Sequence, residues 1–380
     1  MKFFKIIAII YFLLPNKAFS INTSAQQAIL YDVQTDTVIF EKNSDELMSP
    51  SSMSKLMTVY YIFKKINDGE ILLTDKFKVS KKAWKKGGSK MFLNVNSYVT
   101  IEDLLRGIIV QSGNDACITI AEGFSGTESS FAEELNILAK EIGLTNSFFS
   151  NSTGWPDPDH LMTARDILKL SLKTIRDFPD LYKIYSEKEF SYSNIKQNNR
   201  NPLLFSDPYT DGLKTGQTSL GGYGLVASSI RKNRRVILVL NGLKSNNQRK
   251  KESKRFMDIA FNNFKNLKIL EKGQLIEKIN VWNGVVNKIE VKSEQNLIIN
   301  VPKSMKNNIK VSLKYTSPLI APIRKNDQIA ELFIEDEKGN LIKKVSLTSN
   351  VVIKDKNFLS KVFFKLKYLI LGESIFSLKE

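Results

Sequence analysis

The 380-residue sequence contains one cysteine and one histidine, and this scarcity limits the chemistry that the chain can perform. Because Cys117 has no second cysteine to pair with, the chain must be held together by its core alone, without an internal disulfide. Its apolar neighbours at 116–118 indicate a small buried residue. A cysteine nucleophile needs a histidine partner and a catalytic zinc ion needs several ligands, whereas His160 stands alone. We therefore expect no metal and no cofactor, and we expect the chemistry to depend on serine, lysine and backbone groups.

The sequence also lacks a nucleic-acid-binding motif, although it is strongly basic. It has 56 Lys and Arg against 39 Asp and Glu, a formal net charge of +17. Such a surplus attracts nucleic acid, anionic lipid and acidic cell-wall polymer alike. The basic residues are dispersed along the chain, and a general compositional bias explains them equally well. We expect no nucleic-acid partner.

The apolar run near the N-terminus is too short to span a bilayer comfortably. It covers 6–14, follows Lys2 and Lys5, and precedes the small-residue pattern of a cleavage site at 18–20. These features predict a signal peptide over residues 1–20, so the rest of the chain is exported. An uncleaved N-terminal anchor is the alternative.

The order of helical and strand patterns predicts an α+β fold. Strand patterns at 27–32 and 37–40 flank a turn and predict a β-hairpin, and a helix with apolar residues at helical spacing opens after Pro50. The segment 163–166 resembles a capping box with Asp in place of Glu. Further helices are expected at 101–110, 115–124, 129–142 and about 252–265, and strands near 213–215, 223–230 and 235–243. This order predicts a sheet sandwiched by helices.

The composition changes in the last third of the chain. Short alternating segments at 297–301 and 309–313 predict a small all-β domain over 268–354, after a larger α+β domain over 21–267. An amphipathic helix over 355–380 completes the chain. Its apolar face consists of Phe358, Leu359, Val362, Phe363, Leu366, Leu369 and Ile370, with Lys361 and Lys365 opposite. We expect this helix to lie in a membrane interface, and packing on the chain's own β-domain is the alternative.

A Ser-x-x-Lys pattern begins the helix that follows Pro50. Residues three apart share a helix face, so the Lys55 amine can approach the Ser52 hydroxyl. A serine needs such a base, and a lysine serves as one only if burial or positive charge lowers its pKa. The pattern also occurs at Ser193 and Ser229, which we interpret as lying in polar, turn-like stretches. Only Lys55 has apolar neighbours that favour desolvation.

Two other short motifs carry polar groups suited to catalysis. The hydroxyl and amide of Ser112-Gly113-Asn114 could relay a proton and hold a carbonyl, although this motif alone is typical of a helix-capping turn. A strand edge at Lys214-Thr215-Gly216 could pair with an extended peptide and bind its terminal carboxylate. Gly216 would allow the peptide backbone to approach closely. A plain β-turn is the alternative.

Together and in this order, the three motifs resemble the active-site signature of penicillin-recognising serine enzymes. The stretches 111–117, 163–166, 211–216 and 222–228 resemble the low-molecular-weight D-alanyl-D-alanine carboxypeptidases, and the β-domain and terminal helix match that family's layout. The resemblance implies a β-lactamase/transpeptidase-like catalytic domain. It also implies a serine carboxypeptidase that acts on peptidoglycan stem peptides ending in D-Ala-D-Ala and is acylated by β-lactams. Such an enzyme would be attached peripherally to the periplasmic side of the inner membrane.

The resemblance also implies roles for individual residues. Ser52 would form the acyl-enzyme, with Lys55 as the general base. Ser112 and Lys214 would pass the proton to the leaving amine, and Asn114 would hold a substrate amide.

The remaining roles that it implies concern substrate binding. The backbone N–H groups of Ser52 and Gln217 would form the oxyanion hole, and Thr215 with Arg249 would bind the terminal carboxylate. Arg200 matches a family arginine near the site. Gln217 departs from the histidine common in close relatives, but its expected role uses only the backbone.

Three alternatives to a carboxypeptidase stay open at this point. A β-lactamase shares the motifs, but many use a glutamate in a Glu-x-x-Leu-Asn segment, where this chain has Ala132. An endopeptidase specificity is harder to exclude. A non-catalytic, membrane-associated wall-binding protein would keep the fold without turnover.

Overall fold

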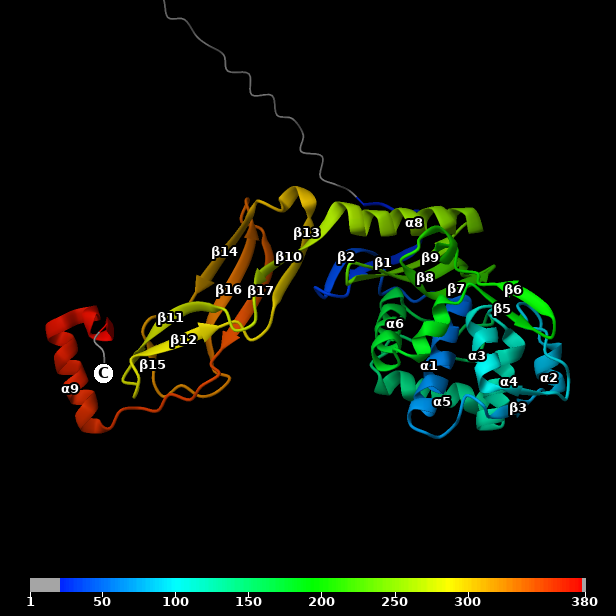
Figure 1. The fold of residues 1–380 in the computed structure, drawn as a ribbon, viewed down its shortest axis with the longest axis horizontal. Coiled ribbons are helices and arrows are strands. Elements are labelled where there is room, and N and C mark those ends of the chain that lie inside the picture. The colour runs from blue at the N-terminus through cyan, green and yellow to red at the C-terminus, as the bar shows by residue number, and fades with distance from the viewer. Residues whose placement is uncertain (1–20, 378–380) are drawn as a thin grey trace, which may run out of the picture.

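The computed structural model describes residues 21–377, which form a helix-and-sheet body, an elongated β-region and a terminal helix, one after another along the molecule (Figure 1). The predicted signal peptide, residues 1–20, lies outside the described residues, as do 378–380. Across 21–377, no helix is both long enough and apolar enough to cross a membrane.

A five-stranded antiparallel sheet organises the first body, with the strand order β2-β1-β9-β8-β7. Its strands are β1 (Gln27–Asp32), β2 (Thr37–Lys42), β7 (Thr210–Thr218), β8 (Gly222–Arg231) and β9 (Arg234–Leu243). The predicted hairpin is confirmed, and a short turn at Lys232 and Asn233 joins β8 to β9. Strand β7 is longer than predicted and has a sheet neighbour on one side only, so its other edge is open.

Helices cover both faces of this sheet (Figure 1). One face carries α1 (Lys55–Asn67), α3 (Ile101–Ile109), α4 (Asn114–Ser125), α5 (Glu128–Glu141) and α6 (Ala164–Asp177), and the other carries α8 (Asn246–Asn263). The α+β prediction is confirmed, but α8 begins about six residues earlier than expected. The cause is local: the Ser245 side chain caps the helix by accepting a hydrogen bond from the Gln248 N–H.

Short elements complete the body. They are β3 (Lys76–Lys78), α2 (Lys81–Lys85), β4 (Tyr98–Thr100), the 3-10 helix η2 (Leu181–Ser186), β5 (Glu189–Tyr192), β6 (Ile195–Asn198) and α7 (Leu203–Ser206). Strand β3 pairs with β4, and β5 pairs with β6, as two small two-stranded sheets outside the main one.

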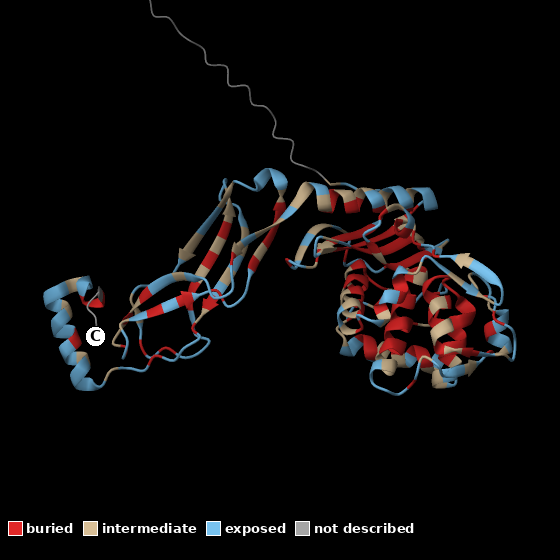
Figure 2. Ribbon diagram, in the orientation of Figure 1, coloured by how far each residue is buried: buried red, intermediate tan, exposed pale blue. Residues whose placement is uncertain are grey.

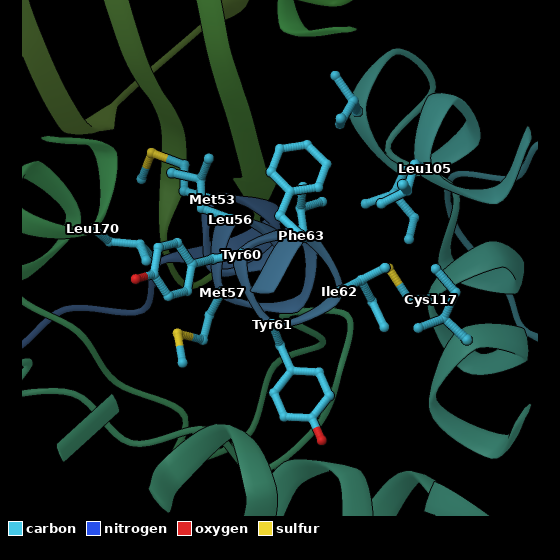
Figure 3. Packing of buried hydrophobic residues seen from close by; sticks show 14 of the residues in the cluster. Met53, Leu56, Met57, Tyr60, Tyr61, Ile62, Phe63, Leu105, Cys117 and Leu170 are labelled. Atoms are coloured by element: carbon cyan, nitrogen blue, oxygen red, sulfur yellow. The ribbon is translucent and has the colours of Figure 1, made fainter. Parts of the chain in front are cut away.

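Helix α1 is the centre of the hydrophobic core (Figure 3). Every residue from 55 to 63 is buried, because α1 is packed on all sides by the sheet and by the helices around it. Leu105 of α3, Cys117 of α4 and Leu170 of α6 belong to the same cluster. This packing fixes the start of α1, and with it the Ser52–Lys55 pair, inside the body.

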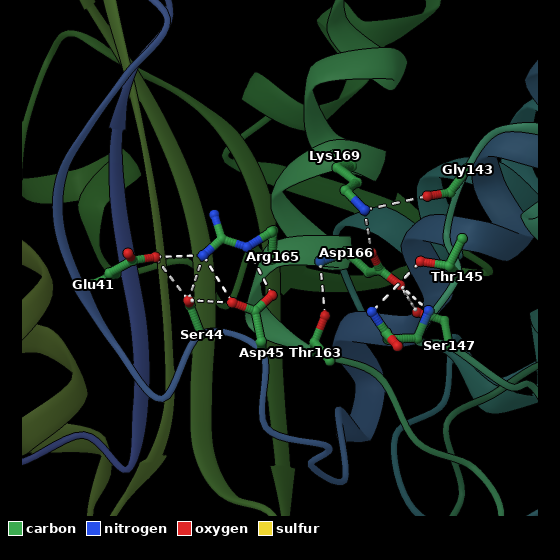
Figure 4. Close-up of polar contacts among 11 residues, drawn as sticks. Glu41, Ser44, Asp45, Gly143, Thr145, Ser147, Thr163, Arg165, Asp166 and Lys169 are labelled. Atoms are coloured by element: carbon green, nitrogen blue, oxygen red, sulfur yellow. Dashed lines mark hydrogen bonds and ion pairs between the residues drawn. The ribbon is translucent and has the colours of Figure 1, made fainter.

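The predicted capping box at the start of α6 is half right (Figure 4). The Thr163 side chain accepts from the Asp166 N–H at 3.0 Å, as expected. The Asp166 carboxylate instead accepts from the Asn146 N–H at 2.8 Å and from the Ser147 hydroxyl at 2.9 Å. Asp is one methylene shorter than Glu, and here its carboxylate ties the preceding loop to α6.

The β-region has a hydrophobic core of its own (Figure 2). Its strands are β10 (Phe264–Leu270), β11 (Leu275–Trp282), β12 (Lys288–Lys292), β13 (Leu297–Pro302), β14 (Ile309–Lys314), β15 (Leu319–Ile320), β16 (Gln328–Asp336) and β17 (Leu341–Thr348), with the 3-10 helix η3 (Lys303–Met305). They form small sheets, as the alternating sequence predicts.

Helix α9 (Phe358–Leu371) lies at the far end of the β-region, with the 3-10 helix η4 (Gly372–Ser377) folded back beside it (Figure 1). One side packs on β11, where the Trp282 ring lies 5.2 Å from Phe364 and 4.7 Å from Tyr368. The predicted apolar face points elsewhere and is exposed, with Leu369 and Ile370 both at 81%. Packing on the chain's own β-domain therefore accounts for one side of the helix and leaves the apolar face uncovered.

Candidate active site

Ser52 lies in a strained turn at the start of α1. The predicted helix begins as a 3-10 helix, η1 (Ser51–Ser54), and Ser51 has a positive φ of 51°. A loop presses against this turn at Gly154, where an added Cβ would lie 2.1 Å from the Ser51 carbonyl oxygen. Only glycine fits there, and Ser52 itself remains partly exposed.

Lys55 is fully buried directly beneath Ser52. Its Nζ donates to Ser52 Oγ at 2.9 Å, to Asn114 Oδ1 at 2.8 Å and to the Thr153 carbonyl. Burial, with smaller contributions from the positive charges of Arg200 and Lys86, lowers the pKa of this amine to about 8. The amine is thus poised to exchange a proton with the serine hydroxyl near neutral pH.

The Ser112-Gly113-Asn114 motif forms the turn between α3 and α4. Asn114 is the first residue of α4, and its Nδ2 donates to the Gly87 carbonyl at 2.9 Å. Ser112 has a positive φ of 63°, and its buried Oγ has no hydrogen-bond partner among the described residues. A buried hydroxyl without a partner is costly, which is typical of a group that waits for a ligand.

Strand β7 brings the third motif to the same place. Lys214 is 2% exposed, and its Nζ donates to the Thr215 carbonyl at 3.1 Å. Burial lowers the pKa of Lys214 well below its usual value, and the charges of Lys55 and Arg200 add to this effect. Two buried amines that repel each other favour the loss of a proton from at least one.

Gly216 sets how closely β7 approaches the nucleophile turn. A Cβ at this position would lie 2.8 Å from the Pro50 carbonyl oxygen and 3.1 Å from the Ser51 Cβ. We expected Gly216 to leave room for the backbone of a bound peptide. The structure shows that the turn at Pro50 and Ser51 already fills this room. Beyond it, Thr215 is buried and Gln217 is exposed on the open edge strand, where an extended peptide can add as a further strand.

Arg249 reaches β7 from α8. Its Nη1 donates to the carbonyls of Gly216 and Gly224, both at 3.3 Å, while its buried Nε has no partner among the described residues. Burial lowers the pKa of the guanidinium to about 10. Arg249 therefore lies beside Thr215, because it bonds to the carbonyl of the next residue, Gly216. Within 21–377, no hydrogen bond joins the side chains of Arg249 and Thr215.

Arg200 lies at the rim of the site and is exposed. Its Nη1 donates to the Ser89 hydroxyl at 2.5 Å, and the Ser89 carbonyl accepts from the Asn114 N–H at 2.7 Å. Arg200 is thus linked to the centre through Ser89. All ten predicted site residues lie on the few segments that surround Ser52, and Arg200 is the most peripheral.

The two other Ser-x-x-Lys matches are not sites. Ser193 lies in the exposed turn between β5 and β6, as expected. The interpretation of Ser229 as turn-like was wrong, because it is fully buried in β8 and donates to Asp207 Oδ2 at 2.9 Å. The polar residues around Ser229 belong to a buried strand, and the Ser229 hydroxyl is satisfied by the buried carboxylate of Asp207.

Sequence reasoning missed the backbone groups that hold the motif side chains. The carbonyls of Thr153 and Gly87 accept from Lys55 and Asn114. The available signals were the glycine pair at 87–88 and the lone Gly154, both in loops. Gly88 and Gly154 have φ values of 77° and 72°, which mark backbone that side chains rarely allow.

Cys117 and His160 take structural positions, in line with the sequence analysis. Cys117 is fully buried, and burial raises the pKa of its thiol to about 12. His160 packs against Phe149, accepts from the Ser150 N–H at 3.2 Å, and has a pKa lowered to about 4 by burial. Neither offers a thiolate–imidazole pair.

A serine hydroxyl bonded to a buried lysine, beside an open strand edge, defines a serine enzyme that works by acyl transfer. Comparisons with known proteins agree. Residues 15–245 match the family model described as D-alanyl-D-alanine carboxypeptidase, and 264–355 match penicillin-binding protein 5, C-terminal domain. The D-alanyl-D-alanine carboxypeptidase DacA of Haemophilus influenzae is 36% identical over 315 residues, 81% of this chain and 80% of that protein.

Solved structures give the same picture. Penicillin-binding protein 5 from Haemophilus influenzae superposes with a TM-score of 0.78 at 35% identity, over 88% of this chain and 98% of that one. Penicillin-binding protein D2 from Listeria monocytogenes, in its cefotaxime-bound form, gives 0.59 at 26% identity, over 64% and 99%. This chain belongs to the D-alanyl-D-alanine carboxypeptidase family of serine peptidases.

Proposed function

We propose that this chain removes the terminal D-alanine from peptidoglycan stem peptides that end in D-Ala-D-Ala, through an acyl-enzyme on Ser52. The observation that carries the proposal is the 2.9 Å hydrogen bond between Lys55 Nζ and Ser52 Oγ, made by a lysine whose pKa burial lowers to about 8. At pH 7 a lysine with this pKa is neutral in roughly one molecule in ten, a far larger fraction than for an exposed lysine, so it can act as the base.

The reaction follows from this pair. Neutral Lys55 takes the proton from Ser52 Oγ as the oxygen attacks the carbonyl carbon of the penultimate D-alanine. Ser112 and Lys214 pass a proton to the amine as the carbon–nitrogen bond breaks, and D-alanine leaves. Water, deprotonated by the same set of groups, then attacks the ester, and the proton returns to Ser52 Oγ.

Substrate binding uses the open edge of β7. An extended peptide along this edge would place its terminal carboxylate near Thr215, Gly216 and Arg249, and its scissile carbonyl near the N–H groups of Ser52 and Gln217. Donors aimed at the developing oxyanion stabilise the transition state more than the substrate. We assign Asn114 to a substrate amide and Arg200 to the rim.

β-Lactams fit the same centre as acylating inhibitors, as the cefotaxime-bound relative suggests. Rapid hydrolysis of the drug would need a carboxylate near the ester. In α5, Ala132 is buried, Glu133 is exposed, and Glu134 accepts a hydrogen bond from the Tyr61 hydroxyl. These positions favour a slow β-lactam turnover and a peptidase.

The proposed division of the chain follows these roles. The signal peptide is 1–20, the catalytic domain 21–267, the β-domain 268–354 and the membrane-associating helix 355–380. Strand β10 begins at Phe264, so the joint lies within a few residues of the proposed boundary. The exposed apolar face of α9 supports peripheral attachment on the periplasmic side of the inner membrane.

One assay tests the activity directly. Purified protein incubated with a soluble pentapeptide ending in D-Ala-D-Ala should release D-alanine, and the absence of release would contradict the proposal. A cross-linked dimer of stem peptides serves as the second substrate. Faster cleavage of the cross-link than of the pentapeptide would make the chain an endopeptidase.

A deletion tests the tail. Protein without residues 356–380 should leave the membrane fraction and keep its rate on soluble peptide. A change of Leu369 and Ile370 to Glu should have the same effect, because both side chains are exposed on the apolar face. If these variants still sediment with membranes, the proposal that α9 attaches the protein to the membrane is wrong.

A further inference from the structure

Helix α8 connects the active site with the joint between the catalytic body and the β-region (Figure 1). Near its start, Arg249 contacts the Gly216 carbonyl of β7. At its end, Asn263 is followed directly by strand β10. At about 1.5 Å per residue, the helix extends for roughly 21 Å from Arg249 to Asn263.

Two adjoining hollows lie along this path, and both are lined by basic residues. The first, of about 650 Å³, is lined by Lys250, Lys251, Lys254 and Arg255. The second, of about 700 Å³, lies at the joint and is lined by Arg231, Lys232, Arg234, Lys265 and Lys303. Asn262 lines both hollows, so they adjoin at this residue, and we call them together the basic track.

Much of the charge of the basic track is uncompensated. Five of its lysines are exposed and have no ion pair within residues 21–377: Lys232, Lys250, Lys251, Lys265 and Lys303. Asp258 is the one acidic residue among the residues that line the two hollows. Like charges gathered in a concave surface create a field that draws in an anionic ligand.

Aromatic rings hold the arginines of the joint hollow in place. The Arg231 guanidinium lies 4.4 Å from the centre of the Phe261 ring and 5.3 Å from that of Tyr209, and Arg234 lies 5.3 Å from Phe261. Each arginine already pairs with a carboxylate of the body, Arg231 with Asp207 and Arg234 with Asp32. The two guanidinium groups therefore shape the joint hollow, and its exposed lysines supply the charge that attracts a further carboxylate.

We propose that the basic track binds a carboxylate-rich strand of the peptidoglycan polymer, as a second contact with the substrate away from Ser52. This inference rests on the proposed function, because the occupant is the polymer whose stem peptides the enzyme trims. Stem peptides carry free carboxylates at intervals along the strand, and the basic track presents cations over a comparable extent. The site retains the enzyme on the polymer between cleavages.

The position of α9 favours the polymer over a membrane as the occupant. The exposed apolar face of α9 lies at the far end of the β-region, whereas the basic track begins on the catalytic body (Figure 1). A protein resting on a membrane through α9 therefore holds the catalytic end of the track away from that surface.

The test changes the five unpaired lysines Lys232, Lys250, Lys251, Lys265 and Lys303 to Gln in the full mature protein. The matched control changes five exposed lysines of the β-region that also lack ion pairs within 21–377 to Gln: Lys272, Lys288, Lys310, Lys325 and Lys338. Both variants lose the same charge, and neither removes an ion pair within residues 21–377. Sedimentation with insoluble peptidoglycan measures binding at low and high salt.

The track variant should bind peptidoglycan about tenfold more weakly than the control near 0.1 M salt, and the difference should shrink as salt increases. Wild-type binding should also fall on peptidoglycan whose carboxylates have been converted to amides. Release of D-alanine from soluble pentapeptide should be equal in all three proteins, and this readout separates failure of the track from failure of the proposed activity.

Two results would overturn the proposal. Equal binding of the track variant and the control to peptidoglycan would show that the basic track makes no contact with it. Loss of binding only to vesicles of anionic lipid, with peptidoglycan binding retained, would assign the surface to a membrane instead.

Discussion

The catalytic body buries charged side chains, whereas the described β-region from 264 to 353 buries none (Figure 2). Among the buried carboxylates of the body, Asp32, Asp166 and Asp207 have cationic partners, whereas Asp115 accepts hydrogen bonds from backbone N–H groups. The basic side chains of Lys55, Lys214 and Arg249 are buried without any ion pair among residues 21–377. Burying a basic group without an ion pair lowers the free energy of unfolding. We infer that these residues are buried for their role in the reaction and not for stability.

The β-region shows the opposite arrangement. Its buried polar residues are the uncharged Ser293, Asn300 and Ser349, and its lysines lie at the surface. Apolar packing alone explains it as a stable support between the catalytic body and α9. The contrast predicts that changes in the body alter activity more than stability, and that changes in the β-region do the reverse.

Replacing Ser52 should have the largest effect. Ser52→Ala removes the nucleophile, so release of D-alanine from pentapeptide should fall by at least about 10⁴-fold while the protein stays folded. Ser193→Ala is the matched control, because Ser193 belongs to the same Ser-x-x-Lys pattern in an exposed turn. Loss of activity in the control, or its survival in Ser52→Ala, would contradict the assignment.

Lys55→Met should separate activity from stability. Met fills a similar volume without a charge, so acylation should slow by about 10³-fold, in the range of a lost general base. The melting temperature should fall by only a few degrees, because the loss of the three hydrogen bonds of Nζ is offset by the removal of a buried amine that has no ion pair. Calorimetry and the rate of penicillin attachment check this prediction, and a large drop in melting temperature would mean that Lys55 is structural.

Arg249→Gln should weaken recognition of the terminal carboxylate. We expect kcat/KM to fall by about 10- to 100-fold on a peptide with a free carboxylate, since a hydrogen bond to a charged group is lost. A peptide whose C-terminus is an amide should be affected much less. Lys250→Gln, at the exposed neighbour, is the control, and equal losses on both peptides would place Arg249 in a structural role.

The pH dependence tests the buried lysine in the unaltered protein. Lys55 acts as a base only when neutral, and its pKa is lowered to about 8. Below that value kcat/KM should fall about tenfold per pH unit as the neutral fraction decreases, and above it the rate should level off. A rate that rises as the pH falls, or that ignores pH between about 6 and 8, would remove Lys55 as the base.

A core change in the β-region should affect activity least. Ile334 is fully buried in β16, so Ile334→Ala should lower the free energy of unfolding of that region by about 2–5 kcal/mol. The rate on soluble pentapeptide should not change at temperatures where the region stays folded. A matching loss of activity would show that the two regions are coupled and that the contrast between them is false.

The sequence predicted the side chains of the site because each motif is local. Ser52 and Lys55 are three residues apart, and the apolar neighbours of Lys55 predict its burial. The same reasoning found the α+β body, most helices and the exposed apolar face of α9. Ser229 misled it, since a polar stretch can also be a buried strand whose hydroxyls meet a carboxylate from elsewhere.

The rest of the site depends on contacts between distant segments. The carbonyls of Thr153 and Gly87 are backbone groups, and every residue has one. A pattern of side chains therefore cannot predict which carbonyl accepts these hydrogen bonds. The contact of Arg249 with β7 depends on the placement of α8, whose start the sequence located about six residues late. The basic track joins residues from two hairpin turns, α8 and the β-region, and only folding brings them together.

The most direct measurement locates the acyl group. Protein trapped with a labelled penicillin is digested, and the labelled peptide is identified by mass spectrometry. The account predicts a single adduct on Ser52, formed far more slowly in Lys55→Met. An adduct on another residue such as Ser112, or equal labelling rates with and without Lys55, would contradict it.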